Sequence, residues 1–192
     1  MPLIYFVRHG QTDYNASKRI QGELEIPINA KGREQARRNG ALLAELIGDK
    51  GRFDFVASPL LRARQTMEIV RDAMGLPAQG YRTDDRLKEI SFGEWAGLTW
   101  PEIEARDPET YARRQVDRWN VAAPGGGSYR DLYQGVVEWI ESVRSDSIAV
   151  AHYGTARCIR AHFLKLKPAA ILDLDAPQDK VLMIEADKLT WL

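Results

Sequence analysis

Short apolar runs that alternate with helix-like segments constrain the fold of this chain more than any other feature. Leu3–Val7, residues 53–57 and residues 147–151 are rich in β-forming residues and have the pattern of short strands that are covered on both faces. Spacing and end signals predict helices over Asn29–Ile47, Leu60–Met74, Asp131–Val143 and Thr155–Leu166. Strands and helices that alternate in this way imply βαβ units with right-handed crossovers, and hence a largely parallel sheet with helices on both faces. The predicted class is α/β.

The remaining segments suggest one insertion and one terminal hairpin. Residues 92–127 contain several tryptophans and the helix breakers Pro101, Pro108 and Pro124, which predicts a largely helical insertion that ends in a loop. The tail Lys180–Leu192 contains an apolar run and predicts an edge hairpin. Because no internal repeat or linker stands out and 192 residues can bury one sizeable core, we expect a single domain over residues 1–192.

The charge balance and the single cysteine exclude several classes of protein. The 27 Lys and Arg residues offset the 27 Asp and Glu residues, so no global field favours nucleic acid or an acidic membrane. Cys158 is the one cysteine, which rules out an internal disulfide framework. The apolar stretch at the N-terminus is too short for a signal peptide or a membrane span. We therefore expect a cytoplasmic protein without nucleic-acid or membrane partners.

Basic and imidazole side chains follow the three predicted strands. Arg8 and His9 follow the first strand, Arg62 and Arg64 follow the second after its turn, and His152 follows the third. In a parallel sheet the carboxyl ends of the strands share one edge, and ligands bind in the crevice outside that edge. Forked guanidinium groups, imidazoles and the amides of a glycine-containing turn that enters a helix suit a compact dianion. The sequence thus predicts a phosphate site there.

Hydrolysis of a phosphate monoester at this edge requires a nucleophile and an acid for the leaving group. A neutral imidazole such as that of His9 can attack phosphorus with one nitrogen when an acceptor holds the proton on the other. The best candidate for the acid is Glu89, which lies in a semi-apolar segment after a possible short strand. On spacing alone Glu94 and Glu102 remain alternatives.

Rival chemistries have weaker support in the sequence. Motifs for nucleotide phosphate loops, dinucleotide binding and serine hydrolases are absent from the sequence. Asp173 and Asp175 are spaced like the aspartates of magnesium-dependent aspartyl-phosphate enzymes but lie near the C-terminus. Cys158 lacks an arginine six residues on, as a cysteine phosphatase loop would need, and we expect it to fill the core. His162 lies inside the last helix, and three scattered histidines offer no metal-ligand spacing. We predict neither a metal nor a cofactor.

Ordered motifs along most of the chain resemble those of one known family. The matching positions are Arg8–Thr12 with Asn15, Gln21-Gly22 through Gln35-Ala36, Ser58–Leu60 with Arg62 and Thr66, Leu87 and Glu89 with Phe92–Trp95 and Gly97, and His152 with Gly154. Taken together they are similar to the motifs of the histidine phosphatase superfamily, also called the phosphoglycerate mutase-like family. The segment Phe92–Trp95 looks more like the phosphatase branch, which includes the alpha-ribazole phosphatases.

The resemblance implies a three-layer α/β/α sandwich and a role for each matching residue. His9 would be the phosphorylated nucleophile and Glu89 the proton donor. Three further residues, Arg8, Arg62 and His152, would stabilise the phosphoryl group. The residues that would line the substrate side are Asn15, Gln21 and Gly22.

Two positions depart from the family pattern. Tyr153 stands where the family usually has a glycine after its second histidine, which alters how closely the backbone can approach the pocket. Gly127 stands where a similar loop commonly carries glutamate. Pocket shape and one substrate-side contact are therefore expected to differ from the family.

Three functions are compatible with these residues. The leading hypothesis is a phosphoric monoester hydrolase of the histidine acid phosphatase type, which acts on a small phosphorylated metabolite through His9 and water activated by Glu89. A phosphoglycerate mutase would use the same residues but exclude water from the intermediate. A non-catalytic phosphate-binding domain is the third hypothesis. The apolar tail strand could also pair across a homodimer.

Overall fold

One sheet organises the chain, whose computed structural model describes residues 1–192 apart from the side chain of Ala169. Within this range six strands follow the order β3-β2-β4-β1-β5-β6. The strands are β1 (Ile4–Arg8), β2 (Asp54–Ala57), β3 (Arg82–Thr83), β4 (Ser147–Ala151), β5 (Val181–Glu185) and β6 (Lys188–Trp191). The first four pair in parallel, whereas β5 and β6 are antiparallel to their neighbours. The sheet is therefore mixed but mostly parallel, as predicted.

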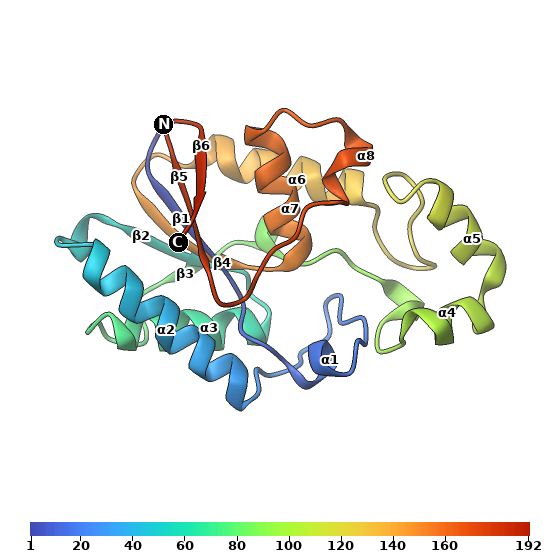
Figure 1. Ribbon diagram of the computed structural model, residues 1–192, viewed down its shortest axis with the longest axis horizontal. Helices are drawn as coiled ribbons and strands as arrows, with labels where there is room; N and C mark the ends of the chain where they lie inside the picture. Colours follow the sequence, from blue (N-terminus) through green and yellow to red (C-terminus); the bar gives the residue numbers. More distant parts are fainter.

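Helices cover both faces of this sheet (Figure 1). The α-helices are α1 (Asp13–Ala16), α2 (Ala30–Leu46), α3 (Leu61–Ala73), α4 (Trp100–Arg106), α5 (Pro108–Val116), α6 (Tyr129–Ser142), α7 (Tyr153–Phe163) and α8 (Pro168–Ile171). Short 3-10 turns lie at η1 (Lys50–Arg52), η2 (Asp85–Leu87) and η3 (Gly93–Trp95). Helices α2 and α3 pack on one face, and α6 and α7 on the other. This arrangement is the predicted three-layer α/β/α sandwich.

The two halves of the core explain why the strand sequences are continuously apolar. Successive residues of a strand point to opposite faces of the sheet. Tyr5 and Val7 of β1 join the core cluster that contains Leu43 of α2, whereas Phe6 joins the cluster that contains Trp139 of α6. Because helices cover both faces, both sets of β1 side chains are buried. The strands thus give a firm base for the residues at their ends.

The helices begin and end within two residues of the predicted bounds except at the C-terminal end of the last one. That helix, α7, begins at Tyr153 instead of Thr155 and ends at Phe163 instead of Leu166. The helix α6 begins at Tyr129 instead of Asp131, because Ser128 caps it: the Asp131 amide donates to the Ser128 hydroxyl over 3.2 Å, and the Asp131 carboxylate accepts from the Ser128 amide.

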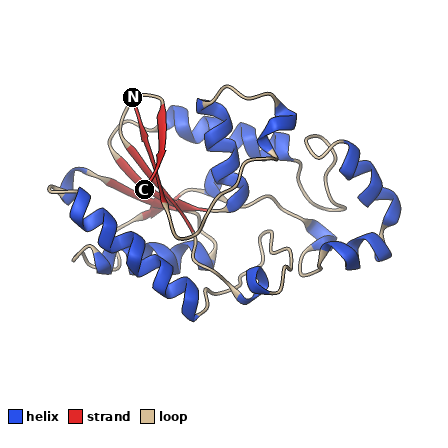
Figure 2. Ribbon diagram, viewed as in Figure 1, coloured by secondary structure: helices blue, strands red, loops and turns tan.

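The segment 92–127 contains helices, as predicted, and forms a lobe beside the sheet (Figure 1). Helices α4 and α5 pack against each other in this lobe, which long loops join to the rest of the chain (Figure 2). The tail forms the predicted hairpin, in which β6 is the edge strand. In the described part of the chain, no helix combines the length and apolar character needed to cross a bilayer. That residues 1–192 form one domain stays a prediction.

Candidate active site

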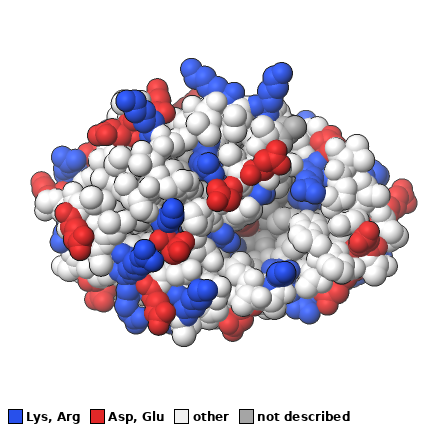
Figure 3. Space-filling model, in the orientation of Figure 1, with Lys and Arg blue, Asp and Glu red and all other residues white. Residues whose placement is uncertain are grey.

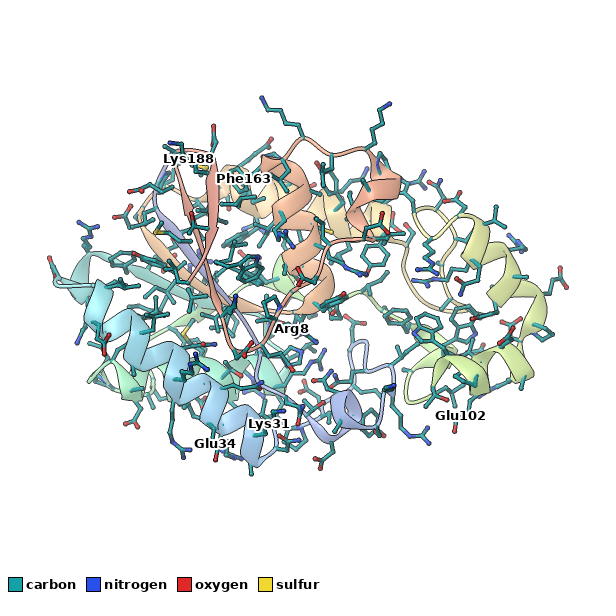
Figure 4. All side chains as sticks on the ribbon, viewed as in Figure 1. Arg8, Lys31, Glu34, Glu102, Phe163 and Lys188 are labelled. Atoms are coloured by element: carbon teal, nitrogen blue, oxygen red, sulfur yellow. The ribbon has the colours of Figure 1, made fainter. Side chains whose placement is uncertain are left out.

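The carboxyl ends of β1, β2 and β4 lie at one edge of the sheet, as expected for parallel strands. The His9 amide donates to the Ala151 carbonyl over 2.9 Å, and the Ser58 amide donates to the Val150 carbonyl over 2.9 Å. These bonds extend the sheet ladder beyond the strands, so the side chains that follow are held firmly. The ring centroids of His9 and His152 are 5.2 Å apart. Arg8 lies at this edge near the middle of the molecule (Figure 4).

The environment of His9 fixes both its charge and its tautomer. Its side chain is buried, and burial together with the positive charges of Arg62 and Arg8 lowers the pKa of His9 well below its usual value. Its Nδ1 atom lies 2.8 Å from the Gly10 carbonyl oxygen. A carbonyl can only accept a hydrogen bond, so Nδ1 carries the proton and Nε2 keeps its lone pair. His9 therefore has the form that a nucleophile needs.

His152 lies beside His9 and is completely buried. Burial and the charge of Arg62 lower the pKa of His152 well below its usual value, so this ring is also neutral. Its Nε2 atom lies 2.7 Å from the Ser58 hydroxyl. Among the described residues, Nδ1 of His152 has no hydrogen-bond partner. Buried polar atoms are nearly always paired, so this nitrogen retains an unused hydrogen-bonding capacity beside His9.

Arg62, in the first turn of α3, supplies a positive charge at this edge of the sheet. Its side chain is 1% exposed, and its terminal nitrogens donate to the carbonyls of Leu24 over 2.8 Å and of Gly22 over 2.6 Å. Burial lowers the pKa of Arg62 to about 10, so the guanidinium stays charged at neutral pH. The same side chain thus carries charge and holds the loop that contains Gly22.

Arg8 supplies a second positive charge from the end of β1. Its Nη1 atom donates to the Ala176 carbonyl over 2.7 Å, and its guanidinium lies 4.7 Å from the ring centroid of Tyr153. Burial lowers the pKa of Arg8 to about 10, which again leaves it charged. The Nε atoms of Arg8 and Arg62 have no partner among the described residues. Two charged groups with free donors in one pocket favour an anion.

Glu89 lies at the N-terminus of α7. One oxygen of its carboxylate accepts from the Gly154 amide over 3.1 Å, and the other accepts from the Ile90 amide over 3.0 Å. A Cβ atom on Gly154 would lie 2.3 Å from Oε1 of Glu89, far closer than real contacts. A side chain at position 154 would therefore displace the Glu89 carboxylate from its present place.

A cavity of about 150 Å³ joins the residues that the sequence singled out. Its lining contains Arg8, His9, Asn15, Gln21, Gly22, Arg62 and Glu89, together with Arg19, Ile20, Phe92 and Tyr153. His152 lies beneath, in contact with His9. We call this cavity the phosphoryl pocket. Arg64, Glu94 and Glu102 do not line it, and Glu102 instead pairs with Arg19 over 2.8 Å.

Three residues that support this pocket were missed by sequence reasoning as site residues. The Gln178 side chain donates to the His9 carbonyl over 3.0 Å and to the Asn15 side chain over 3.2 Å. The Thr66 hydroxyl accepts from the Gly10 amide over 3.0 Å, and Ser58 bonds His152. Ser58 and Thr66 belong to the motifs quoted above, so a signal for them existed. Gln178 lies 169 residues from His9 and gives no signal in the sequence.

The rival chemistries find little support in the geometry. Cys158 is completely buried, and burial raises the pKa of its thiol, so it packs as core and is a poor nucleophile. The His162 ring packs edge-on against Phe163 and does not line the phosphoryl pocket. Within the described residues, no group of three or more His, Cys, Asp or Glu side chains is placed to hold a metal ion. The prediction that no metal or cofactor is needed remains untested.

The family model of the histidine phosphatase superfamily (branch 1) matches residues 4–191. The chain belongs to this superfamily. Within it, the glucosyl-3-phosphoglycerate phosphatase of Mycobacterium tuberculosis is 34% identical over 181 residues, which cover 86% of this chain and 77% of that protein. Phosphoglycerate mutase-like protein 4 of Arabidopsis thaliana is 32% identical over 173 residues, which cover 87% of this chain and 72% of that protein.

A solved structure of the superfamily confirms the fold. The alpha-ribazole phosphatase from Shigella flexneri superimposes with a TM-score of 0.81 at 23% identity, and the match covers 99% of this chain and 94% of that one. The resemblance drawn from the sequence motifs is therefore confirmed for family and fold.

Proposed function

We propose that this histidine phosphatase superfamily member hydrolyses small phosphate monoesters through a phosphohistidine on His9. The observation that carries the proposal is a neutral His9 with an unprotonated Nε2, in a pocket that also contains Arg8, Arg62 and Glu89. The proposal makes the chain a phosphoric monoester hydrolase of the histidine acid phosphatase type. The phosphatase among its relatives supports the same class of reaction.

In the first step, Nε2 of His9 attacks phosphorus and the bond from phosphorus to the ester oxygen breaks. Protonated Glu89 donates its proton to that oxygen, and the alcohol leaves. Arg8 and Arg62 offset the charge of the phosphoryl oxygens, and the unpaired nitrogen of His152 is available to one of them. The Gly10 carbonyl stabilises the proton on Nδ1 as the ring becomes positively charged.

In the second step, water replaces the alcohol. The Glu89 carboxylate removes a proton from this water, whose oxygen attacks phosphorus while the bond to Nε2 breaks. The products are inorganic phosphate, neutral His9 and protonated Glu89, so the enzyme returns to its starting form. Asn15, Gln21 and Gly22 line the pocket on the substrate side in this proposal.

A phosphoglycerate mutase is the second candidate, because the Arabidopsis thaliana relative is named as a phosphoglycerate mutase-like protein. Such an enzyme must keep water from the phosphohistidine until the product is rephosphorylated. The phosphoryl pocket of this chain adjoins a second cavity of about 510 Å³, which gives water a route to it and favours hydrolysis.

The central test is to trap the intermediate. We expect wild-type protein to hydrolyse p-nitrophenyl phosphate in the presence of EDTA and to retain label from a radioactive substrate in an acid-labile, alkali-stable form after rapid quenching. His9→Ala should lose both signals, with turnover reduced by at least about 1,000-fold because the nucleophile is absent. His162→Ala is the matched control, because this histidine lies outside the pocket, and it should retain both.

Other outcomes identify the alternatives. A wild type that needs magnesium for turnover would contradict the mechanism. Interconversion of phosphoglycerates with little free phosphate would identify a mutase. Binding of orthovanadate without any turnover or labelling would identify a non-catalytic phosphate-binding domain.

Three further expectations remain proposals. We propose that the protein is cytoplasmic and has no nucleic-acid or membrane partner. We also propose that the edge strand β6, whose residues alternate between exposed and half-buried, can pair across a homodimer. Light scattering of the purified protein would test the dimer.

A further inference from the structure

A second cavity of about 510 Å³ adjoins the phosphoryl pocket and shares Glu89, Phe92 and Tyr153 with it. In the space-filling view the surface is hollowed right of centre, between the α4–α5 lobe and the rest of the protein (Figure 3). A phosphoryl group held by Arg8 and Arg62 would direct its ester oxygen past Glu89, so the alcohol part of the substrate would occupy this second cavity. We call it the leaving-group cavity. Its volume is typical of sites that enclose a drug-sized ligand.

One wall of the leaving-group cavity consists of aromatic rings near and within the insertion. The ring centroid of Trp100 lies 6.2 Å from that of Phe92 and 6.2 Å from that of Tyr111. Behind them Trp95 is 1% exposed and packs edge-on against Trp100. Trp100 itself is 37% exposed, so its ring is available for further contacts. The exposed part of the Trp100 ring thus offers aromatic surface to a ligand, and the buried Trp95 ring supports it from behind.

The opposite wall consists of two tyrosines that one arginine holds in place. The Arg157 side chain donates to the Tyr129 hydroxyl over 3.3 Å and to the Tyr153 hydroxyl over 2.7 Å. Its guanidinium also lies 4.1 Å from the ring centroid of Tyr153. These contacts fix the rings before any substrate binds, which lowers the entropic cost of binding.

Of the arginines around this cavity, Arg157 is the one whose guanidinium nitrogens are all paired with described residues. Arg157 donates from Nε to the Leu174 carbonyl over 2.6 Å in addition to its bonds with the two tyrosines. Arg114 is 3% exposed and lies over Phe92 and Trp100, 5.3 and 5.4 Å from their ring centroids. Arg118 lies at the rim and donates to the Gln115 side chain. Arg157 is thus occupied on the tyrosine side of the cavity, whereas Arg118 lies exposed at the rim, and Glu89 at the junction of the two cavities would repel an anion.

We propose that the leaving-group cavity selects a flat, uncharged ring, so that the preferred substrates are phosphate monoesters of alcohols that carry an aromatic or heteroaromatic group. The inference rests on the proposed function and specifies its substrate class. Aromatic rings gain from offset or edge-on contacts with other rings beyond the apolar area that they bury. A substrate whose alcohol carries a carboxylate, such as a phosphoglycerate, gains none of these ring contacts, and its carboxylate would approach Glu89.

The test compares substrates in which the phosphate leaves from a primary alcohol, so that the chemistry of the leaving group is nearly constant. The panel consists of benzyl phosphate, cyclohexylmethyl phosphate, glycerol 3-phosphate, glucose 6-phosphate and 3-phosphoglycerate. We expect kcat/KM for benzyl phosphate to exceed that for cyclohexylmethyl phosphate by about 3- to 10-fold, the range that ring contacts supply. The kcat/KM for benzyl phosphate should also exceed the kcat/KM for glycerol 3-phosphate, glucose 6-phosphate and 3-phosphoglycerate by at least about 10-fold.

Variants locate the preference in the molecule. Trp100→Leu and Tyr111→Leu should each lower kcat/KM for benzyl phosphate by about 3- to 10-fold, mainly through KM, and change that for glycerol 3-phosphate less than 2-fold. Trp191→Leu, in the edge strand β6, is the matched control and should change neither. Two substituted positions are used because either variant alone could disturb the lobe.

Distinct results would overturn each level of the proposal. Equal kcat/KM for benzyl and cyclohexylmethyl phosphate, or a preference for glucose 6-phosphate or 3-phosphoglycerate, would refute the aromatic preference while leaving the phosphatase intact. Failure to hydrolyse any member of the panel, with no labelled protein, would instead refute the proposed function.

Discussion

The phosphoryl pocket and the leaving-group cavity share residues but are built in different ways. The pocket lies at the ends of strands, where the buried side chains of His9 and Arg62 are fixed by hydrogen bonds to backbone carbonyls and that of His152 by the Ser58 hydroxyl. The cavity lies between the sheet layers and the lobe of α4 and α5, where rings such as Trp100 provide the surface. The phosphoryl pocket suits one chemical group, a phosphoryl group. Substitutions in the leaving-group cavity can alter which alcohol is accepted without altering the residues that act on phosphorus.

Among the variants that test this difference between the two regions, the largest effect should come from Gly154, which belongs to the phosphoryl pocket. Gly154→Ala adds a Cβ atom 2.3 Å from the present position of Glu89 Oε1 and must displace the carboxylate. We expect kcat/KM to fall by about 100-fold, because a displacement of this order removes the acid from its working position. The fall should be similar for benzyl phosphate and glycerol 3-phosphate.

Gly135→Ala provides the control for Gly154→Ala. In the middle of α6, a Cβ atom on Gly135 would meet only Arg86 Cβ, at 4.0 Å, among the described neighbours. This variant should keep wild-type activity. If Gly154→Ala folded normally by circular dichroism and kept full activity, the position of the Glu89 carboxylate beside the Gly154 amide would not be the one that catalysis requires.

A smaller effect should come from Tyr153, which borders both regions. Its ring lies under the Arg8 guanidinium, and such a contact in a desolvated setting is a substantial cation–π interaction. We expect Tyr153→Leu to raise the inhibition constant of orthovanadate by about 3- to 30-fold, because Arg8 loses its support. Tyr153→Phe keeps the ring and should stay within about 3-fold of wild type.

The same pair of variants decides to which region Tyr153 belongs. If Tyr153→Leu changed only the KM of benzyl phosphate and left vanadate inhibition unaltered, the residue would serve the leaving-group cavity alone. Thermal melting of each variant checks that the fold is retained.

The smallest effect concerns stability, and it tests the pocket alone. The pKa values of His9 and His152 are lowered in the folded chain, so below about pH 6.5 the unfolded chain binds protons that the folded chain does not. The free energy of unfolding should therefore be at its full value above this pH and fall below it. Each histidine contributes a slope of up to about 1.4 kcal/mol per pH unit.

Urea denaturation between pH 7.5 and 5.5 in phosphate-free buffer measures this slope. His9→Gln removes one of the two buried histidines and should flatten the slope by about the share of one group. An unchanged slope in this variant would contradict the burial of a neutral imidazole at position 9.

Sequence reasoning located the pocket because its parts follow from local rules. Apolar runs predicted three strands. Because the carboxyl ends of parallel strands lie at one edge of a sheet, His9 and His152 were then expected to lie together, although 143 positions separate them in the chain. Glu89 needed the family motif, because spacing alone did not distinguish it from Glu94 and Glu102. The structure separates these carboxylates, since Glu89 alone among them lines the pocket.

The parts that sequence reasoning could not supply depend on loop conformation and long-range packing. Gln178 reaches His9 only because the segment before β5 crosses the end of β1. The sequence prediction placed the start of α6 at Asp131, two residues too late. It did not anticipate that Ser128 would form a capping box, which starts the helix at Tyr129. The insertion was expected to be helical, but which of its rings would face a cavity depends on how the lobe packs.

The contacts of Ala176 and Gln178 with Arg8 and His9 have a consequence for biosynthesis. Arg8 and His9 are made more than 160 residues before the two residues that support them. The β5 strand, which pairs with β1, is also made late. A nascent chain that ends before residue 176 thus carries the imidazole of His9 and the guanidinium of Arg8 without these supports, and the site is completed only after residue 178 has been made.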